Sequence, residues 1–227
     1  MRVSVIIPAF NEERSISHVV QDIPRDYVDD IIVINNASTD STAAVAEQAG
    51  ATVLDEPVPG YGRACLKGID YLVSKSEKPE IVVFMDGDYS DYPEELPKLV
   101  APICEDGMDL VIGSRAIGNR EKGSMTPQQV FGNWLATRIL KWKYGAEFTD
   151  LGPFRAIRYD RLIDLNMQDK NYGWTVEMQL RAAVQGLKYT EVPVRYRKRI
   201  GTSKVSGTLK GTVMAGYKIL WTLFTYG

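Results

Sequence analysis

Two acids separated by a single glycine follow an apolar run in the first half of the chain. Asp86 and Asp88 come directly after residues 81–85, and Gly87 between them lets the backbone turn and leaves space beside it. Two carboxylates so close repel each other unless a cation lies between them, and Mg²⁺ or Mn²⁺ binds such ligands together with substrate phosphates. Because open α/β sheets bind ligands at the carboxyl ends of their strands, the pattern predicts a metal and diphosphate site. The alternative is a solvated acidic turn.

Polar residues also follow two earlier apolar runs. The run 3–7 leads into Pro8, Ala9, Phe10, Asn11 and Glu12. Asn11 is predicted to cap the following helix, whose N-terminus attracts anions. The run 31–34 leads into residues 35–40, Asn-Asn-Ala-Ser-Thr-Asp, whose small polar groups either bond a base or ribose or only cap the next helix.

These residues need a scaffold, and short apolar runs alternate with helix-like segments along the chain. The predicted strands are residues 3–7, 31–34, 52–54, 81–85, 110–112, 154–157 and 189–194. The predicted helices are residues 12–22, 41–48, 63–74, 94–103, 130–144, 175–185 and 209–224. The strand-like runs are β-branched and nearly continuous, which predicts an α/β fold with a mostly parallel sheet flanked by helices. Residues 113–128 break the pattern and predict a long loop, typical of a lid.

Composition gives the two ends of the chain opposite charge. The length of 227 residues suits one large domain or a domain with a C-terminal extension, divided here into 1–208 and 209–227, and a hydrophobic fraction of 44% is enough for a buried core. Its two cysteines show neither metal spacing nor a disulfide framework, which favours a reducing compartment. Residues 1–100 hold 18 acidic and 8 basic side chains, whereas residues 181–227 hold 9 basic and one acidic. The basic end is either a solvated surface or a patch for phosphates or anionic lipid.

The last predicted helix is amphipathic. Its apolar stripe consists of Leu209, Val213, Tyr217, Leu220 and Phe224. The segment is too short and too polar to span a bilayer, which takes about 20 apolar residues. It therefore either packs on the protein's own core or lies in a membrane interface.

Taken together, the strand ends resemble glycosyltransferase family 2, which has the GT-A (Rossmann-like) fold. The matching segments are residues 7–12, 38–40, 60–64, 85–88 and 113–115. Within that family, the polyprenyl-phosphate glycosyltransferases of the dolichyl-phosphate mannosyltransferase type are most similar. Their later motifs resemble residues 149–150, 152–156, 177, 191–194 and 197–204. On this resemblance, residues 1–208 are the GT-A domain, and the amphipathic helix 209–227 follows it, with core packing and membrane contact as its two alternatives.

The resemblance also implies roles for individual residues. Those implied to bind the nucleotide sugar are Pro8, Phe10, Glu12, Asn36, Arg63, Asp86, Gly87 and Asp88. Asp86 and Asp88 would hold Mg²⁺ or Mn²⁺. Those implied to contact phosphates of the donor or acceptor are Arg115, Arg197, Ser203 and Lys204. The catalytic set is Asp88, Arg115, Glu177 and Lys204. Where the family usually has two acids this chain has Asn35 and Asn36, which leaves the identity of the base open.

The implied reaction transfers one hexose, with inversion, from a nucleoside diphosphate sugar of the UDP-glucose or GDP-mannose type to a polyprenyl phosphate. A phosphate acceptor needs no strong general base, whereas a hydroxyl acceptor does. Glu177 is the best base for a hydroxyl acceptor, unless it forms an ion pair with Arg181 one turn on. The only histidine, His18, is predicted to be a surface or packing residue.

Other functions and the cellular setting follow from the same residues. A soluble family 2 enzyme acting on a hydroxyl, a nucleotidyltransferase and a non-catalytic binding module are the alternatives. The segment 8–12 lacks the glycine-rich loop that a nucleotidyltransferase would carry after its first strand. We expect a cytoplasmic protein held peripherally on the inner face of the membrane, with no nucleic-acid partner. A homodimer and a separate membrane subunit both remain open.

Residues 201–207 predict a flexible basic loop that closes over the bound donor. Substitution Lys204→Ala should therefore cut turnover by about a hundredfold, because it removes a positive charge that would stabilise the negative charge developing on the leaving group. The fold should stay intact, as judged by an unchanged circular dichroism spectrum. Wild-type turnover in this variant would contradict the assignment.

Overall fold

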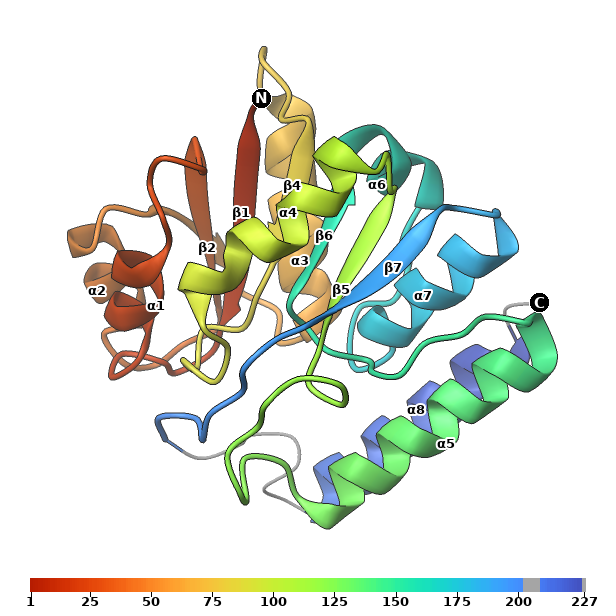
Figure 1. Ribbon diagram of the computed structural model, residues 1–227. Helices are drawn as coiled ribbons and strands as arrows, with labels where there is room; N and C mark the ends of the chain where they lie inside the picture. The colour runs from red at the N-terminus through yellow and green to blue at the C-terminus, as the bar shows by residue number, and fades with distance from the viewer. Residues whose placement is uncertain (202–208, 226–227) are drawn as a thin grey trace.

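The computed structural model describes residues 1–201 and 209–225 (Figure 1). Within these residues seven strands form one sheet in the order β3-β2-β1-β4-β6-β5-β7. The strands are β1 Val3–Ala9, β2 Asp30–Asn36, β3 Thr52–Glu56, β4 Ile81–Phe84, β5 Leu110–Ser114, β6 Arg155–Arg158 and β7 Tyr189–Pro193. Every residue of β1, β4 and β5 is buried, as the continuous apolar runs predict for strands covered on both faces.

The mostly parallel sheet is confirmed. β1 pairs in parallel with both β2 and β4, β2 with β3, and β5 with β7. β6 is antiparallel to both of its neighbours, so β4 and β5 on either side of it point in the same direction. The carboxyl ends of β1, β2, β4 and β5 therefore meet at one edge of the sheet. That edge gathers the polar segments that follow these strands.

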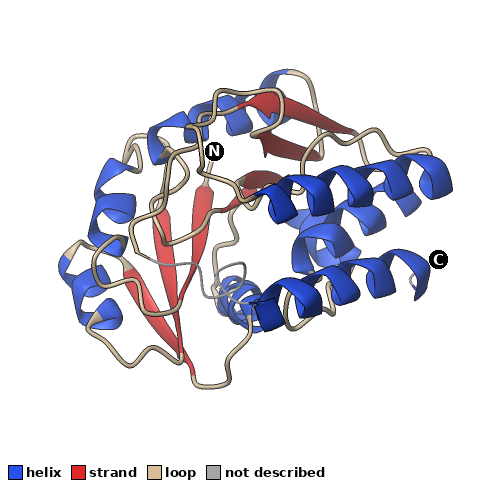
Figure 2. Ribbon diagram, turned by 90° about the horizontal axis from the view of Figure 1, so that it is seen from below, coloured by secondary structure: helices blue, strands red, loops and turns tan. Residues whose placement is uncertain are grey.

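Helices cover both faces of the sheet, as the view from below shows (Figure 2). The helices are α1 Ile16–Asp22, α2 Thr42–Gln48, α3 Tyr61–Ser74, α4 Leu96–Glu105, α5 Pro127–Tyr144, α6 Tyr159–Leu165, α7 Trp174–Val184 and α8 Leu209–Thr225, with a 3₁₀ turn, η1 Pro93–Glu95, before α4. Side chains of β1 alternate between the two cores: Val5 and Ile7 pack with α1, α2 and α4, whereas Ile6 packs with α3 and α7.

Several boundaries differ from the prediction. α1 begins at Ile16 and not at residue 12, and it has no side-chain cap. Asn11, predicted to be that cap, has a φ of 55° and bonds across to the next strand end instead. α5 begins earlier than predicted because Thr126 and Gln129 form a capping box ahead of it. The short helix α6 was not predicted.

The C-terminal helix α8 packs on the protein's own core along one side only. It lies beside α5, and the two helices run in the same direction (Figure 1). Lys143 Nζ and Tyr144 Oη at the end of α5 donate to the Leu223 carbonyl, at 3.1 and 2.7 Å. Thr222 and Leu223 are fully buried.

The predicted apolar stripe of α8 lies on its other side. Tyr217, Leu220 and Phe224, the stripe members whose side chains are described, are 59%, 36% and 55% exposed. The remaining two, Leu209 and Val213, lie outside the described side chains. No helix in the described part of the chain is long and apolar enough to cross a membrane. Core packing and an exposed apolar stripe are therefore both present, on opposite sides of α8.

We predict that Leu223→Ala lowers the free energy of unfolding by about 2–4 kcal/mol, because it leaves a cavity in the core. Leu220→Ala, on the exposed side of the same helix, is the matched control and should cost less than about 1 kcal/mol. Urea unfolding of both variants measures the difference. Equal costs would mean that α8 does not pack as described.

Candidate active site

The Asp88 carboxylate, buried at the edge of the sheet after β4, is held on both of its oxygens. Asp88 Oδ1 accepts hydrogen bonds from the Ser90 N–H at 2.9 Å and from Ser90 Oγ at 2.5 Å. Asp88 Oδ2 forms an ion pair with Arg199 Nη1 at 2.9 Å. The side chain is therefore oriented by Ser90 and paired with a guanidinium that comes from residue 199, late in the chain.

The Asp86 carboxyl group has fewer hydrogen-bond and ion-pair partners than that of Asp88. Its Oδ1 atom is buried without a hydrogen-bond partner in the described structure. Burial and the neighbouring Asp88 raise the pKa of Asp86 to about 7, against the opposing effects of Arg199 and of a hydrogen bond with the Tyr61 hydroxyl. An unpartnered carboxylate oxygen next to a second carboxylate is a site that attracts a proton or a cation.

This pair of carboxylates fits a divalent cation that shares its ligands with a substrate. Among the described residues, no group of three or more histidine, cysteine or acidic side chains is arranged to hold a metal ion. Asp86 and Asp88 would therefore supply one or two oxygens, with the rest coming from water and phosphate, which is how Mg²⁺ is commonly held. The glycine between them is not needed for a left-handed turn, because that conformation falls on Tyr89, with a φ of 61°.

The basic segment 195–200 lies across the acids. The Arg197 and Ile200 N–H groups donate to the Ser90 and Asp88 carbonyls at 2.9 and 3.0 Å. Although burial alone would lower it, the pKa of Arg199 is raised by Asp88, Tyr196, Asp86 and Glu12. Glu12, predicted from the first strand end, therefore contributes to the field around the same arginine. Arg199 itself was not predicted as a site residue.

Arg197, predicted to contact phosphate, is already engaged by aromatic rings. Its guanidinium carbon lies 3.5 Å from the Tyr89 ring centre and 4.0 Å from that of Tyr92, and Nη2 donates to the Asp91 carbonyl at 3.1 Å. Asp91 beside it was missed by sequence reasoning. Both of its carboxylate oxygens are buried without a partner in the described structure, and burial, Asp86 and Asp88 raise its pKa well above the usual range.

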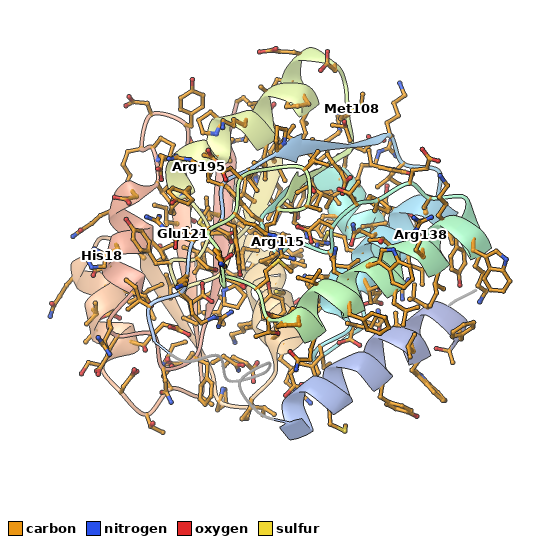
Figure 3. All side chains as sticks on the ribbon, turned by 60° about the horizontal axis from the view of Figure 1, so that its bottom comes forward. His18, Met108, Arg115, Glu121, Arg138 and Arg195 are labelled. Atoms are coloured by element: carbon orange, nitrogen blue, oxygen red, sulfur yellow. The ribbon has the colours of Figure 1, made fainter. Side chains whose placement is uncertain are left out.

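Arg115 forms a buried ion pair with Asp150 through three hydrogen bonds. Its backbone N–H and Nε donate to Asp150 Oδ2, and its Nη2 donates to Asp150 Oδ1, each at 2.7 Å. Burial acts to lower the pKa of Arg115, but the Asp150 carboxylate outweighs this effect, so the pKa is raised above its usual value. Figure 3 shows Arg115 near the centre of the molecule, with His18 at its periphery. His18 packs against Tyr89, as predicted for a packing residue.

The predicted nucleotide-binding residues lie at neighbouring strand ends. Pro8 is buried in β1, and Phe10 after it is 39% exposed. Asn36 is buried, and its amide bonds the Val58 carbonyl and the Gly60 N–H, both at 2.8 Å. Asn36 thus holds the loop before α3, where the Arg63 N–H donates to the Lys170 carbonyl at 3.1 Å. Contact of these residues with a nucleotide stays a prediction.

Glu177 does not suit the role of general base, and this part of the catalytic prediction is corrected. The side chain has no exposed surface. Its Oε1 atom pairs with Arg181 Nε at 2.8 Å and accepts the Gln168 N–H, while Oε2 accepts the Asp169 N–H at 2.7 Å. Both carboxylate oxygens are thus occupied, and the buried position keeps substrate away from them. The ion pair weighed as the alternative is the one observed.

Two predicted residues, Ser203 and Lys204, lie outside the described residues, as does most of the predicted closing loop 201–207.

Next to the Arg115–Asp150 pair, α5 and residues 147–150 line an open groove of about 540 Å³. Its lining includes Arg120, Asn133, Trp134, Arg138, Thr149 and Asp150. The Arg138 guanidinium lies 6.0 Å from the Trp134 ring centre. Among the described residues, neither Arg120 nor Arg138 has an acidic side chain as ion-pair partner.

The raised pKa of Asp86 predicts a specific pH dependence of stability. Between the ordinary carboxyl pKa of 3.8 and the folded value of about 7, the folded state binds a proton that the unfolded state has lost. Stability of the metal-free protein should therefore fall as pH rises through this window, by up to about 4 kcal/mol from this group. Urea unfolding at pH 4 and pH 8 in a chelator measures it. Asp86→Asn should remove most of this loss, and an identical pH dependence in the variant would refute the cause.

The sequence is similar to a known protein family and to individual proteins. The family model of glycosyl transferase family 2 matches residues 4–165. An uncharacterized glycosyltransferase of Mycobacterium tuberculosis is 37% identical over 221 residues, covering 94% of both chains. An undecaprenyl-phosphate mannosyltransferase of Micrococcus luteus is 33% identical over 224 residues, covering 93% of this chain and 90% of that protein.

A solved structure shares the fold over nearly the whole chain. It is glucosyl-3-phosphoglycerate synthase from Mycobacterium tuberculosis in complex with Mn²⁺, UDP-glucose and phosphoglyceric acid. The TM-score is 0.76 at 24% identity, and the match covers 99% of this chain and 79% of that one. At this identity the likeness shows the fold alone.

Proposed function

The chain belongs to glycosyl transferase family 2, and from that membership we propose that it moves one hexose from a nucleoside diphosphate sugar to a polyprenyl phosphate, with inversion at the anomeric carbon. The acceptor class is supported by the undecaprenyl-phosphate mannosyltransferase of Micrococcus luteus. The donor class is supported by the acids at the sheet edge, since Asp86 keeps an unpartnered oxygen there.

On this proposal the diphosphate of the donor binds at the edge formed by Asp86 and Asp88. A divalent cation, Mg²⁺ or Mn²⁺, would neutralise the negative charge that develops on the leaving diphosphate. Arg199, which already lies 2.9 Å from Asp88, places a second positive charge beside it. The carboxylates thus bind and orient the donor, while the basic segment 195–200 supplies charge and covers the site from the solvent.

The observation that carries the acceptor assignment is the groove beside Asp150. It combines two cations, Arg120 and Arg138, with apolar Val130 and Trp134 in one channel. A phosphate monoester with a long apolar chain needs both kinds of surface. Its phosphate oxygen is already an anion, so it can attack the anomeric carbon without a strong base.

A hydroxyl acceptor is less well supported, because it needs a base and the one predicted for it has no open oxygen. Glu177 is buried and bonded on both oxygens. Liposome flotation separates the two cases: we propose peripheral contact with the inner face of the membrane through residues 209–227, where Trp221 and Phe224 are 50% and 55% exposed. A soluble enzyme for a small hydroxyl acceptor would not float with anionic vesicles.

The test is to incubate the full chain with Mn²⁺, radiolabelled UDP-glucose or GDP-mannose, and a polyprenyl phosphate, and to measure label in the organic phase. Arg138→Met should raise KM for the acceptor by about tenfold with little change in KM for the donor, since it removes one phosphate-binding charge. Asp88→Asn should abolish transfer. If neither donor gives a lipid-soluble product with the wild-type chain, the acceptor is wrong.

A further inference from the structure

The loop between α6 and α7 lies directly against the first turn of α3. The Arg63 N–H donates to the Lys170 carbonyl at 3.1 Å. A Cβ atom added to Gly62 would lie 2.0 Å from the Asp169 carbonyl oxygen, far inside contact distance. The two backbones therefore touch, and glycine is needed at residue 62 for this close approach.

That first turn of α3 connects the loop to the candidate active site. Tyr61 in this turn lies close enough to Asp86 that, after burial, the Asp86 carboxylate is the next cause that raises the pKa of the Tyr61 hydroxyl. On its other side the turn is fixed by Asn36, whose Oδ1 accepts the Gly60 N–H at 2.8 Å. The position of the Tyr61 hydroxyl, and with it the setting of Asp86, is thus defined by Asn36 on one side and by the loop on the other.

Two buried carboxylates hold the loop in place. Glu177 accepts the N–H groups of Gln168 and Asp169, at 3.0 and 2.7 Å. Asp169 Oδ1 accepts those of Asn171 and Gly173, at 2.7 and 3.1 Å. These bonds define the backbone from residue 168 to residue 173, the stretch that touches α3.

The second oxygen of Asp169 is directed to the C-terminal helix. Lys218 Nζ on α8 lies 3.0 Å from Asp169 Oδ2, and the Asp169 side chain is 1% exposed. The contact is an ion pair, and no hydrogen bond reaches this oxygen within the described structure. Without Lys218 this buried carboxylate would have no cationic partner among the described residues, and its bonds to the loop would change as it moved toward water.

We propose that Asp169 and Lys218 are positioning residues, through which the docked helix α8 holds the 168–173 loop against α3 and so sets Tyr61 beside Asp86. The inference rests on the proposed function only in taking Asp86 as part of the donor site. Helix α8 then acts on the donor site indirectly, through the loop, although it lies at the opposite end of the sequence from the strand ends that form the site. Neither residue touches the donor.

The experiment compares two substitutions on the full chain. Lys218→Met removes the cation that faces Asp169. Lys143→Met is the matched control, because Lys143 also anchors α8, through the Leu223 and Phe224 carbonyls, but does not contact the loop. Mn²⁺–UDP and Mn²⁺–GDP binding is measured by calorimetry, and amide hydrogen exchange of residues 61–64 is measured without nucleotide.

Lys218→Met should weaken binding of the nucleotide that the wild type prefers by about tenfold and speed exchange at the Arg63 amide, whereas Lys143→Met should change the Kd less than about twofold. In an Asp169→Asn background, Lys218→Met should have little further effect, because no buried charge remains to be compensated. These results together support the proposal.

Two outcomes overturn the proposal, and a third overturns only the donor site on which it rests. Wild-type Kd and exchange in Lys218→Met would show that the ion pair does not position α3. Equal weakening in Lys143→Met would reduce the effect to general docking of α8. If exchange at Arg63 quickens but the wild-type chain binds neither nucleotide with Mn²⁺, the donor site is wrong while the loop–helix coupling stands, so the two failures are told apart.

Discussion

The arrangement of the site depends on negative charge that is buried at one edge of the sheet. Parallel strands bring their carboxyl ends together, and β4 delivers Asp86, Asp88 and Asp91 within six residues of each other. Two of the three hold unpartnered buried oxygens, and the pKa values of both are raised. Such a cluster costs free energy in an isolated sheet, so the rest of the chain must compensate it.

The compensation comes from segments distant in sequence. The basic segment 195–200 bonds to the backbone of residues 88–91 and pairs Arg199 with Asp88. Arg115 and Asp150 form a separate ion pair of opposite charges beside this segment. Arg120 and Arg138, which have no acidic ion-pair partner among the described residues, line the groove. The asymmetry between an acidic first half and a basic end is thus partly resolved inside the fold, where opposite charges meet across the sheet edge.

The sequence predicted the sheet and the strand-end acids because β-branched buried runs leave a strong local pattern. It could not predict Arg199 as the partner of Asp88, since Arg195, Arg197 and Arg199 are equivalent until the segment is placed over Tyr89 and Tyr92. The cap predicted for Asn11 was wrong because its left-handed backbone directs the side chain to Thr39. The groove is made by packing of α5 on residues 147–150, which no local pattern encodes.

The pairing of Arg199 with Asp88 bears on the order in which ligands bind. A cation that comes alone must displace an internal guanidinium and gains only the remaining oxygens of two carboxylates. On the proposed function, a diphosphate that came with the cation would give the displaced arginine a new anion and would supply further oxygens to the metal. The internal ion pair would therefore favour a binding order in which nucleotide and metal enter together.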